Sequence, residues 1–357
     1  MTTVAHHKKS LSDHTVASLQ QEIEGWGLNT HHAARLLKEY YRSGGRVDFA
    51  ELKIGNALEA KVLTEIELRQ ANTLARSVST DGTVKFLLGL KRGGAVEAVL
   101  MDSATPGRAA GCVSSQIGCA MGCDFCASTK RGLERNLEAG EIVEQFLQLR
   151  AEALSSGRQL RTLVFMGMGE PMQNYDNVVA AVERIAGEDL GEFGWRQICI
   201  STVGIVPGID RLADEDRNVV LALSLHAPDD ETRSRIVPMN KRYSVADIMA
   251  ATRRYADKTK RIPNIEYCLL NGVNDSDEQA QMLGDLMRGF RAHVNLIPYN
   301  SIGTGVSGAE YSQPTPERLD SFMSILRAAG VHAHFRKTRG EDVNAACGQL
   351  RETSVAV

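Results

Sequence analysis

Short apolar segments alternate with longer amphipathic segments from about residue 108 to residue 338, and this alternation restricts the fold more than any other feature of the sequence. Segments with the apolar spacing of a helix separate most of the apolar segments, at 141–157, 177–187, 245–258, 277–290 and 316–330. Repeated strand–helix units form a parallel sheet with helices outside it. The apolar segments lie at 111–117, 161–168, 196–202, 219–227, 262–270, 293–300 and 331–338. Six or seven such units predict an α/β fold, a partial (β/α)6 barrel of the TIM type.

The loops after the predicted strands carry polar residues and glycines. The sequences "GMGEP" (167–171), "ISTVG" (200–204), "SLHAP" (224–228) and "IPYN" (297–300) each stand at a strand end, and a cysteine-rich loop follows the first strand. Barrel enzymes carry their chemistry at the carboxyl ends of the strands. We therefore expect these five loops to meet at one functional rim.

The residues before the barrel divide into a helical part and a hairpin. Helical spacing at 16–28, 31–44 and 57–78 predicts a small helical domain over residues 1–78. Two apolar segments around "KRGG" then predict a β-hairpin linker over 79–104, with Glu97 on its second strand. The barrel core, with a cysteine near its C-terminal end, takes residues 105–357.

Composition places the chain among soluble cytoplasmic proteins. The chain is 43% hydrophobic and 24% charged, with a formal net charge of −3, so overall charge does not indicate a nucleic-acid binder. No apolar run approaches the roughly 20 residues of a membrane helix, and no secretory signal is visible at the start. In a reducing compartment, clustered cysteines indicate metal binding or catalysis more than disulfides.

Three of the seven cysteines fall within "GCAMGCDFCAST" (118–129), spaced C-x3-C-x2-C. Cys119, Cys123 and Cys126 can hold three corners of a 4Fe-4S cluster and leave the fourth iron open to a small molecule. The alternative is a zinc site completed by Cys112 or a histidine, although structural zinc sites normally use two separated ligand pairs. Cys199 and Cys268 lie in apolar strands, where we expect small buried core residues.

Longer stretches resemble the RlmN/Cfr family of radical S-adenosylmethionine (SAM) RNA adenosine methyltransferases, and RlmN more than Cfr. The resemblance covers about residues 90–350 and rests on 112–128, 165–178, 200–207, 221–240 and "RKTRGEDVNAACGQL" at 336–350. It implies a radical SAM core with a 4Fe-4S cluster on Cys119, Cys123 and Cys126, and two molecules of SAM per turnover. The implied SAM contacts are Gly169, Glu170, Ser201, Ser224, Leu225, His226 and Asn300.

The resemblance also implies a reaction through a methylated cysteine. Cys347 accepts a methyl group, and its methylene radical adds to adenine to give a transient protein–RNA adduct. Glu97 assists loss of the ring proton, and Cys112 attacks the sulfur of Cys347 to release the RNA. The "RKTRG" stretch favours carbon 2 of adenine as the target over carbon 8, the Cfr-like alternative.

The implied partners are 23S rRNA and some tRNAs, an electron donor such as flavodoxin, and a disulfide reductant, with the protein acting as a monomer. The N-terminal helices correspond to an RNA-binding accessory domain, although "LNTHHAARLLKEYY" (28–41) departs from the family pattern there. The residues expected to hold the RNA backbone are Lys130, Arg131, Arg336 and Arg339. A remote alternative from another class is a non-catalytic zinc-bearing RNA-binding protein.

Overall fold

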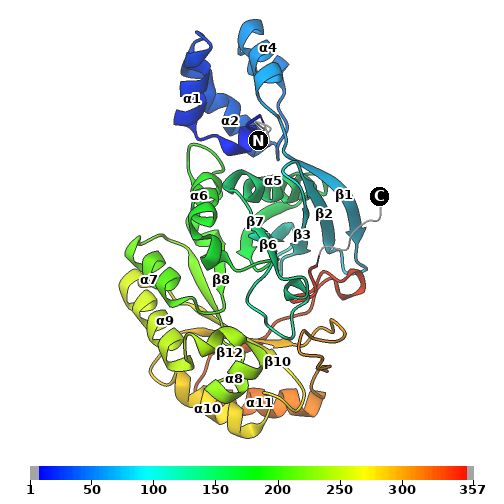
Figure 1. The fold of residues 1–357 in the computed structure, drawn as a ribbon, viewed down its shortest axis with the longest axis vertical. Helices are drawn as coiled ribbons and strands as arrows, with labels where there is room; N and C mark the ends of the chain where they lie inside the picture. The colour runs from blue at the N-terminus through cyan, green and yellow to red at the C-terminus, as the bar shows by residue number, and fades with distance from the viewer. Residues whose placement is uncertain (1–7, 352–357) are drawn as a thin grey trace, which may run out of the picture.

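A computed structural model describes residues 8–351 and contains the predicted parallel sheet (Figure 1). The parallel strands are β4 (Arg108–Cys112), β7 (Gln159–Phe165), β8 (Ile198–Thr202), β9 (Val220–Ser224), β10 (Asn264–Leu269), β11 (His293–Pro298) and β12 (Ala333–Phe335). Each lies beside the next in chain order, and the last strand does not pair back to the first. The sheet is therefore an open, partial barrel, and the predicted fold class is confirmed.

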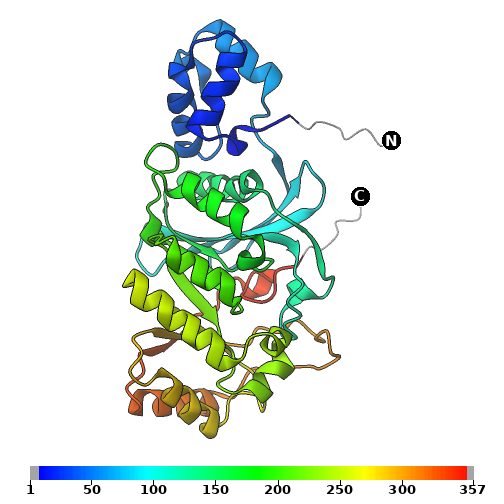
Figure 2. The same cartoon turned by 60° about the vertical axis from the view of Figure 1, so that its left-hand side comes forward.

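Helices cover the outer face of this sheet (Figure 2). The predicted helices form as α5 (Ala139–Ser155), α6 (Tyr175–Ala186), α9 (Val245–Thr259), α10 (Asp277–Met287) and α11 (Pro316–Ala328). Two further helices, α7 (Val206–Asp214) and α8 (Asp230–Ile236), were not predicted. Both are short, and α7 contains Pro207 and Gly208 in its first turn, so the apolar spacing is brief. None of the helices within residues 8–351 is long and apolar enough to cross a membrane.

The N-terminal helices α1 (Val16–Gly25), α2 (Ala33–Arg42), α3 (Phe49–Leu52) and α4 (Asn56–Glu65) form one end of the molecule, beyond α5 (Figure 2). The expectation of helix up to residue 78 is wrong for its last part, because Ala71–Val78 is strand β1. It pairs antiparallel with β2 (Val84–Leu90), from Ala71 opposite Leu90 to Val78 opposite Val84. Pairing with the open edge of β2 satisfies the backbone of β1, and this tertiary contact outweighs local helical spacing.

The predicted hairpin is confirmed and continues the core sheet. Strand β2 pairs antiparallel with β3 (Ala95–Asp102), and β3 pairs antiparallel with β4. The register sets Val99 opposite Cys112, so Glu97, two residues earlier on β3, lies near the end of the first barrel strand. A separate two-stranded sheet, β5 (Gln116–Gly118) and β6 (Leu133–Asn136), brackets the cysteine-rich segment.

Candidate active site

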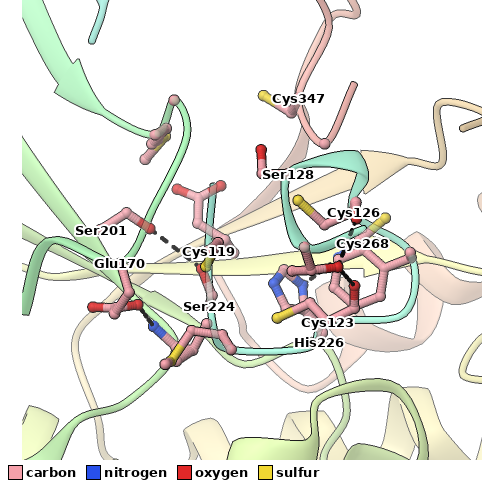
Figure 3. Close-up of a pocket in the computed structure, with 18 of the residues that line it drawn as sticks. Cys119, Cys123, Cys126, Ser128, Glu170, Ser201, Ser224, His226, Cys268 and Cys347 are labelled. Carbon is pink, nitrogen blue, oxygen red and sulfur yellow. Dashed lines mark hydrogen bonds between the residues drawn. The ribbon is translucent and has the colours of Figure 1, made fainter. Parts of the chain in front are cut away.

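The strand-end loops enclose a cavity at the carboxyl ends of the barrel strands, as expected from the sequence (Figure 3). Its empty volume is about 920 Å³, part of it open to solvent. Side chains from the loops after β4, β7, β8 and β9 line it, together with residues of β10 and the segment around Cys347. Cys347 lies on one side of the cavity, and Ser224 and His226 lie on the opposite side.

The cysteine loop, residues 119–132, presents Cys119, Cys123 and Cys126 to this cavity. Its two ends are tied together where the backbone N–H of Cys119 donates to the carbonyl of Gly132 at 2.9 Å. Gly118 has φ +71°, and a Cβ there would lie 1.9 Å from that carbonyl oxygen, so only glycine fits. The short β5–β6 sheet therefore closes the loop and brings its thiols together.

Burial raises the pKa of Cys119 to about 12 and the pKa of Cys123 well above its ordinary value. As free thiols these groups stay protonated, so they become thiolates only beside a strong positive charge such as bound iron. Within residues 8–351, no three His, Cys, Asp or Glu side chains lie close enough together to hold a single metal ion. Three thiols around one roomy cavity are a donor set that suits a 4Fe-4S cluster.

Cys347 links this cavity to a second one with an empty volume of about 830 Å³. Cys347 lines both cavities, whereas Cys112, at the end of β4, lines only the second. Burial raises the pKa of Cys112 to about 12, with a smaller contribution from negative charge on Cys347. The two cysteines, far apart in the sequence, thus face one shared space.

Glu97 lies beside these cavities but lines neither of them. Its carboxylate is buried, pairs with Lys85 at 2.9 Å, and accepts the backbone N–H of Arg351 at 2.7 Å. Burial raises the pKa of Glu97, and the Lys85 ammonium opposes that rise. In this structure the residue therefore holds the C-terminal segment against β2 and β3.

Five of the seven expected SAM contacts line the first cavity, namely Gly169, Glu170, Ser201, Ser224 and His226. The other two do not. The side chain of Leu225 is fully buried outside the cavity wall, and Asn300 lines the second cavity, where its amide donates to the carbonyl of Cys347 at 3.3 Å.

The carboxylate of Glu170 accepts two backbone N–H groups, from Met172 at 3.0 Å and from Val203 at 2.9 Å. These bonds join the loops after β7 and β8. Burial nevertheless raises the pKa of Glu170 to about 7, because desolvation of the carboxylate outweighs the lowering by its hydrogen bonds. An ammonium group beside this carboxylate would stabilise its charged form.

His226 is held as a neutral imidazole. Its Nδ1 accepts the backbone N–H of Cys268 at 3.0 Å, and burial lowers the pKa of His226 to about 3. Its ring meets Phe125 of the cysteine loop edge-on, with 4.8 Å between the ring centroids. The backbone at His226 has φ +61°, an uncommon conformation that turns the ring toward the cysteine loop.

Two residues of the cavity wall, Glu266 and Cys268, were missed as site residues, and so was Arg233, which bonds to the wall from outside it. Glu266 is buried, receives the amide of Asn295 at 2.7 Å through Oε1, and has no hydrogen-bond partner at Oε2. Its signal in the sequence was a charge inside the apolar strand "NIEYCL". Cys268 is buried as expected, yet it also lines the cavity beside Cys126 (Figure 3). Arg233 is fully buried and donates to the carbonyls of Val203, Ser224 and Leu225.

Arg336, expected to contact the RNA backbone, is half-buried, with 26% of its side chain exposed. It lines both cavities, 3.2 Å from the sulfur of Met166 and 3.6 Å from Glu266. Negative charge on Cys347, and then on Glu266, raises the pKa of Arg336. Of the other expected RNA contacts, Lys130 and Arg131 are exposed on the cysteine loop, and Arg339 lines the second cavity.

Comparisons with known proteins agree with this geometry. The family model of the radical SAM superfamily matches residues 113–283. A protein of Opitutus terrae named probable dual-specificity RNA methyltransferase RlmN 1 is 49% identical over 96% of this chain and 97% of its own length. A protein of Thermosynechococcus vestitus named probable dual-specificity RNA methyltransferase RlmN is 40% identical over 96% of this chain and 98% of its own. The crystal structure of a radical SAM methyltransferase from Sphaerobacter thermophilus superposes with a TM-score of 0.90 at 42% identity, covering 96% of this chain and 99% of that one.

Proposed function

Because the chain belongs to the RlmN family of radical SAM methyltransferases, we propose that it methylates carbon 2 of an adenosine in 23S rRNA and in some tRNAs. One observation carries the proposal: Cys347 lines both the cavity of the three clustered thiols and the cavity of Cys112. A methyl carrier must meet the radical source first and its resolving thiol afterwards, and this position allows both.

Cys119, Cys123 and Cys126 would hold a 4Fe-4S cluster, and the cluster, when bound, would supply the electron for cleaving SAM to a radical able to take a hydrogen atom from S-methylated Cys347. This chain's residues then provide the setting for that step. Carbon 2 of adenine is electron-poor, so it does not attack a SAM methyl group directly. Addition of a methylene carbon on Cys347 avoids this difficulty, and cysteine is the residue whose thiolate accepts the methyl group in the first place.

The guanidinium of Arg336 lines the same two cavities as Cys347 and stays protonated, so a positive charge lies beside the cysteine that carries the methyl group. Glu170, Ser201, Ser224 and His226 bind and orient SAM in the first cavity. The raised pKa of Glu170 supports this role, since an ammonium group placed beside the carboxylate stabilises its charged form.

Release of the RNA uses Cys112 and Glu97. The adduct radical would first return one electron to the cluster. Cys112 then loses its proton and attacks Sγ of Cys347; the electron pair of the broken S–C bond stays with the carbon, which takes up a proton to become the methyl group. A Cys112–Cys347 disulfide remains for an external thiol reductant to reduce. Glu97 accepts the proton from carbon 2, which requires its hydrogen bond with the N–H of Arg351 to open. Its raised pKa supports this role, because a base with higher proton affinity holds a transferred proton better.

The wider setting follows from the same chemistry. The adenosine must leave its stack to enter the cavity, and Lys130 and Arg131, exposed beside it, are our candidates for contact with the RNA backbone. The reaction takes place in the cytoplasm, with a flavodoxin-type electron donor and a monomeric enzyme.

The test is anaerobic reconstitution with iron and sulfide, followed by reaction with SAM, reductant and fragments of 23S rRNA or tRNA. We expect a brown protein and 2-methyladenosine in the digested RNA, identified by mass spectrometry against both isomers. Formation of 8-methyladenosine would instead support the Cfr-like alternative, methylation of carbon 8. About one zinc and no iron per chain would instead support the non-catalytic RNA-binding alternative.

A further inference from the structure

The carboxylate of Asp124 connects the cysteine loop to a second loop of the barrel rim. We define the rim loop as residues 299–312, which follow β11. Asp124 stands directly after Cys123, is buried, and lines neither cavity. Its Oδ1 accepts the backbone N–H of Ser307 at 2.7 Å, and its Oδ2 accepts the hydroxyls of Ser307 at 2.5 Å and Tyr311 at 2.6 Å.

The rim loop is shaped for this contact. Thr304 and Glu310 form an isolated bridge, and the N–H of Gly305 donates to the carbonyl of Ala309 at 2.7 Å, so residues 304–310 make a tight turn. A Cβ at Gly305 would lie 2.5 Å from the carbonyl oxygen of Asp124, so a larger residue there would push the two loops apart. Three charge-assisted hydrogen bonds and one close backbone approach therefore converge on one residue of the cysteine loop.

The rim loop also holds the segment that carries Cys347. Asn300 donates to the carbonyl of Cys347 at 3.3 Å, and Gln349 donates to the carbonyl of Ser301 at 3.0 Å. The cysteine loop adds one further tie to the rim loop, from the ammonium of Lys130 to the carbonyl of Ile302 at 2.7 Å. The rim loop thus contacts both the loop of the clustered thiols and the loop of the methyl-carrying cysteine.

We propose that Asp124 is a positioning residue that fixes the cysteine loop against the rim loop and thereby sets where Cys347 lies relative to the three clustered thiols. This role rests on the proposed function, in which a radical formed near the three thiols must reach the methyl group on Cys347. A displacement of about 1 Å at a reacting centre can cost about a hundredfold in rate. Asp124 acts through the two loops and does not touch the reacting atoms.

The first test needs neither cluster nor substrate. Hydrogen exchange in the metal-free protein is compared by mass spectrometry between wild type, Asp124→Ala, the milder Ser307→Ala and the control Asp275→Ala. Asp275 is similarly buried, but its carboxylate accepts the backbone N–H of Gly272 within its own loop and joins no second loop through that bond. For Asp124→Ala we expect hydrogen exchange to be about tenfold faster both in residues 119–132 and in residues 344–350. A tenfold change corresponds to the loss of roughly one charge-assisted hydrogen bond. Ser307→Ala should show the same pattern at smaller size, and Asp275→Ala should show neither change.

The second test measures coupling in the reconstituted enzyme. We expect Asp124→Asn to form several-fold more 5′-deoxyadenosine for each methylated adenosine than wild type, because SAM cleavage continues while the methyl group on Cys347 is misplaced. The proposal would be overturned if the exchange rate of the cysteine loop did not change, or if faster exchange were confined to the rim loop. An unchanged ratio of 5′-deoxyadenosine to methylated adenosine would also overturn it. If wild type methylates no RNA, the proposed function fails, and the exchange experiment still decides whether Asp124 holds the two loops together.

Discussion

Lys85 and Glu97 form an ion pair across strands β2 and β3, and together they hold both ends of the C-terminal segment that carries Cys347. The ammonium of Lys85 donates to the carbonyl of Asn344 at 3.1 Å, and the carboxylate of Glu97 accepts the N–H of Arg351. The pair is mostly buried, with side-chain exposures of 14% for Lys85 and 2% for Glu97. Removal of one partner therefore leaves an uncompensated charge inside the protein.

Lys85→Met should lower the free energy of unfolding by about 3 kcal/mol at neutral pH, and the loss should grow with pH. Burial already raises the pKa of Glu97, and Lys85 is the main group opposing it. Without Lys85 the folded pKa rises further, so stability is retained at low pH and lost as the pH increases through that value. Urea unfolding at pH 5 and pH 8 measures the difference. The double variant Lys85→Met with Glu97→Gln should recover most of the loss, and equal losses at both pH values would contradict this account.

Cys112→Ala should trap a covalent adduct between the protein and its RNA substrate, because the thiol that breaks the S–C bond is gone. Denaturing electrophoresis with labelled RNA detects the adduct. Cys199→Ala is the matched control, since Cys199 is equally buried in β8 and lines neither cavity. The control should release methylated RNA at about the wild-type rate. If Cys112→Ala released free methylated RNA over repeated turnovers, Cys112 would not be the residue that resolves the adduct.

His226 should make the metal-free protein sensitive to mild acid. Burial lowers its pKa from 6.5 to about 3, so the unfolded chain takes up a proton first as the pH falls. Stability is therefore lost below pH 6.5, by about 2 kcal/mol at pH 5 from this group alone. His226→Asn retains an acceptor and tolerates the positive φ, so it should lose less stability than wild type between pH 7 and pH 5. The exposed His332→Asn should behave as wild type, and identical pH profiles for all three proteins would contradict the prediction.

Glu144 anchors the N-terminal helices to the barrel. Its fully buried carboxylate on α5 accepts Tyr40 of α2 at 2.6 Å and Arg69 at 2.5 Å. Arg69→Met should lower the free energy of unfolding by about 3 kcal/mol because Glu144 loses its cation. Limited proteolysis should then cut more readily between residues 65 and 71.

The exposed pair Arg42–Glu39 provides the control for this anchor, since Arg42→Met should cost less than about 1 kcal/mol. A loss below 1 kcal/mol for Arg69→Met as well, with unchanged proteolysis, would show that Glu144 does not hold the helices.

The sequence was sufficient for the elements with a strong and uninterrupted pattern. The long barrel helices, the hairpin, the cysteine loop and most apolar strands lie where they were expected, because burial on both faces of a parallel sheet requires long apolar runs. The first strand is an exception, since it was expected at 111–117 and forms as β4 at Arg108–Cys112. The sequence was insufficient where the apolar pattern of an element was short, or where the segment that pairs with it lies far away in the chain. Helix α7 is only nine residues long and contains Pro207 and Gly208 in its first turn, and β1 became a strand only because the edge of β2 was available to it.

For the site, local sequence showed which residues carry chemistry but not which of them share a space. The motif around Cys347 did not show that this residue lines two cavities, nor that Arg336 lines the same two. Likewise, nothing near Glu97 indicated that its carboxylate is occupied by Lys85 and the N–H of Arg351. Each of these facts depends on contacts between residues far apart in the chain.

The sequence by itself determined most of the alternating strands and helices of the barrel and the three-thiol loop, since apolar periodicity and cysteine spacing are local properties of the chain. The tertiary structure alone decided that Cys112 and Cys347 face one space, that Asp124 joins two loops and that Cys268 enters the cavity wall. The physical reason is that sheet pairing and loop packing fix these distances, and both depend on backbone groups and shapes that distant segments supply.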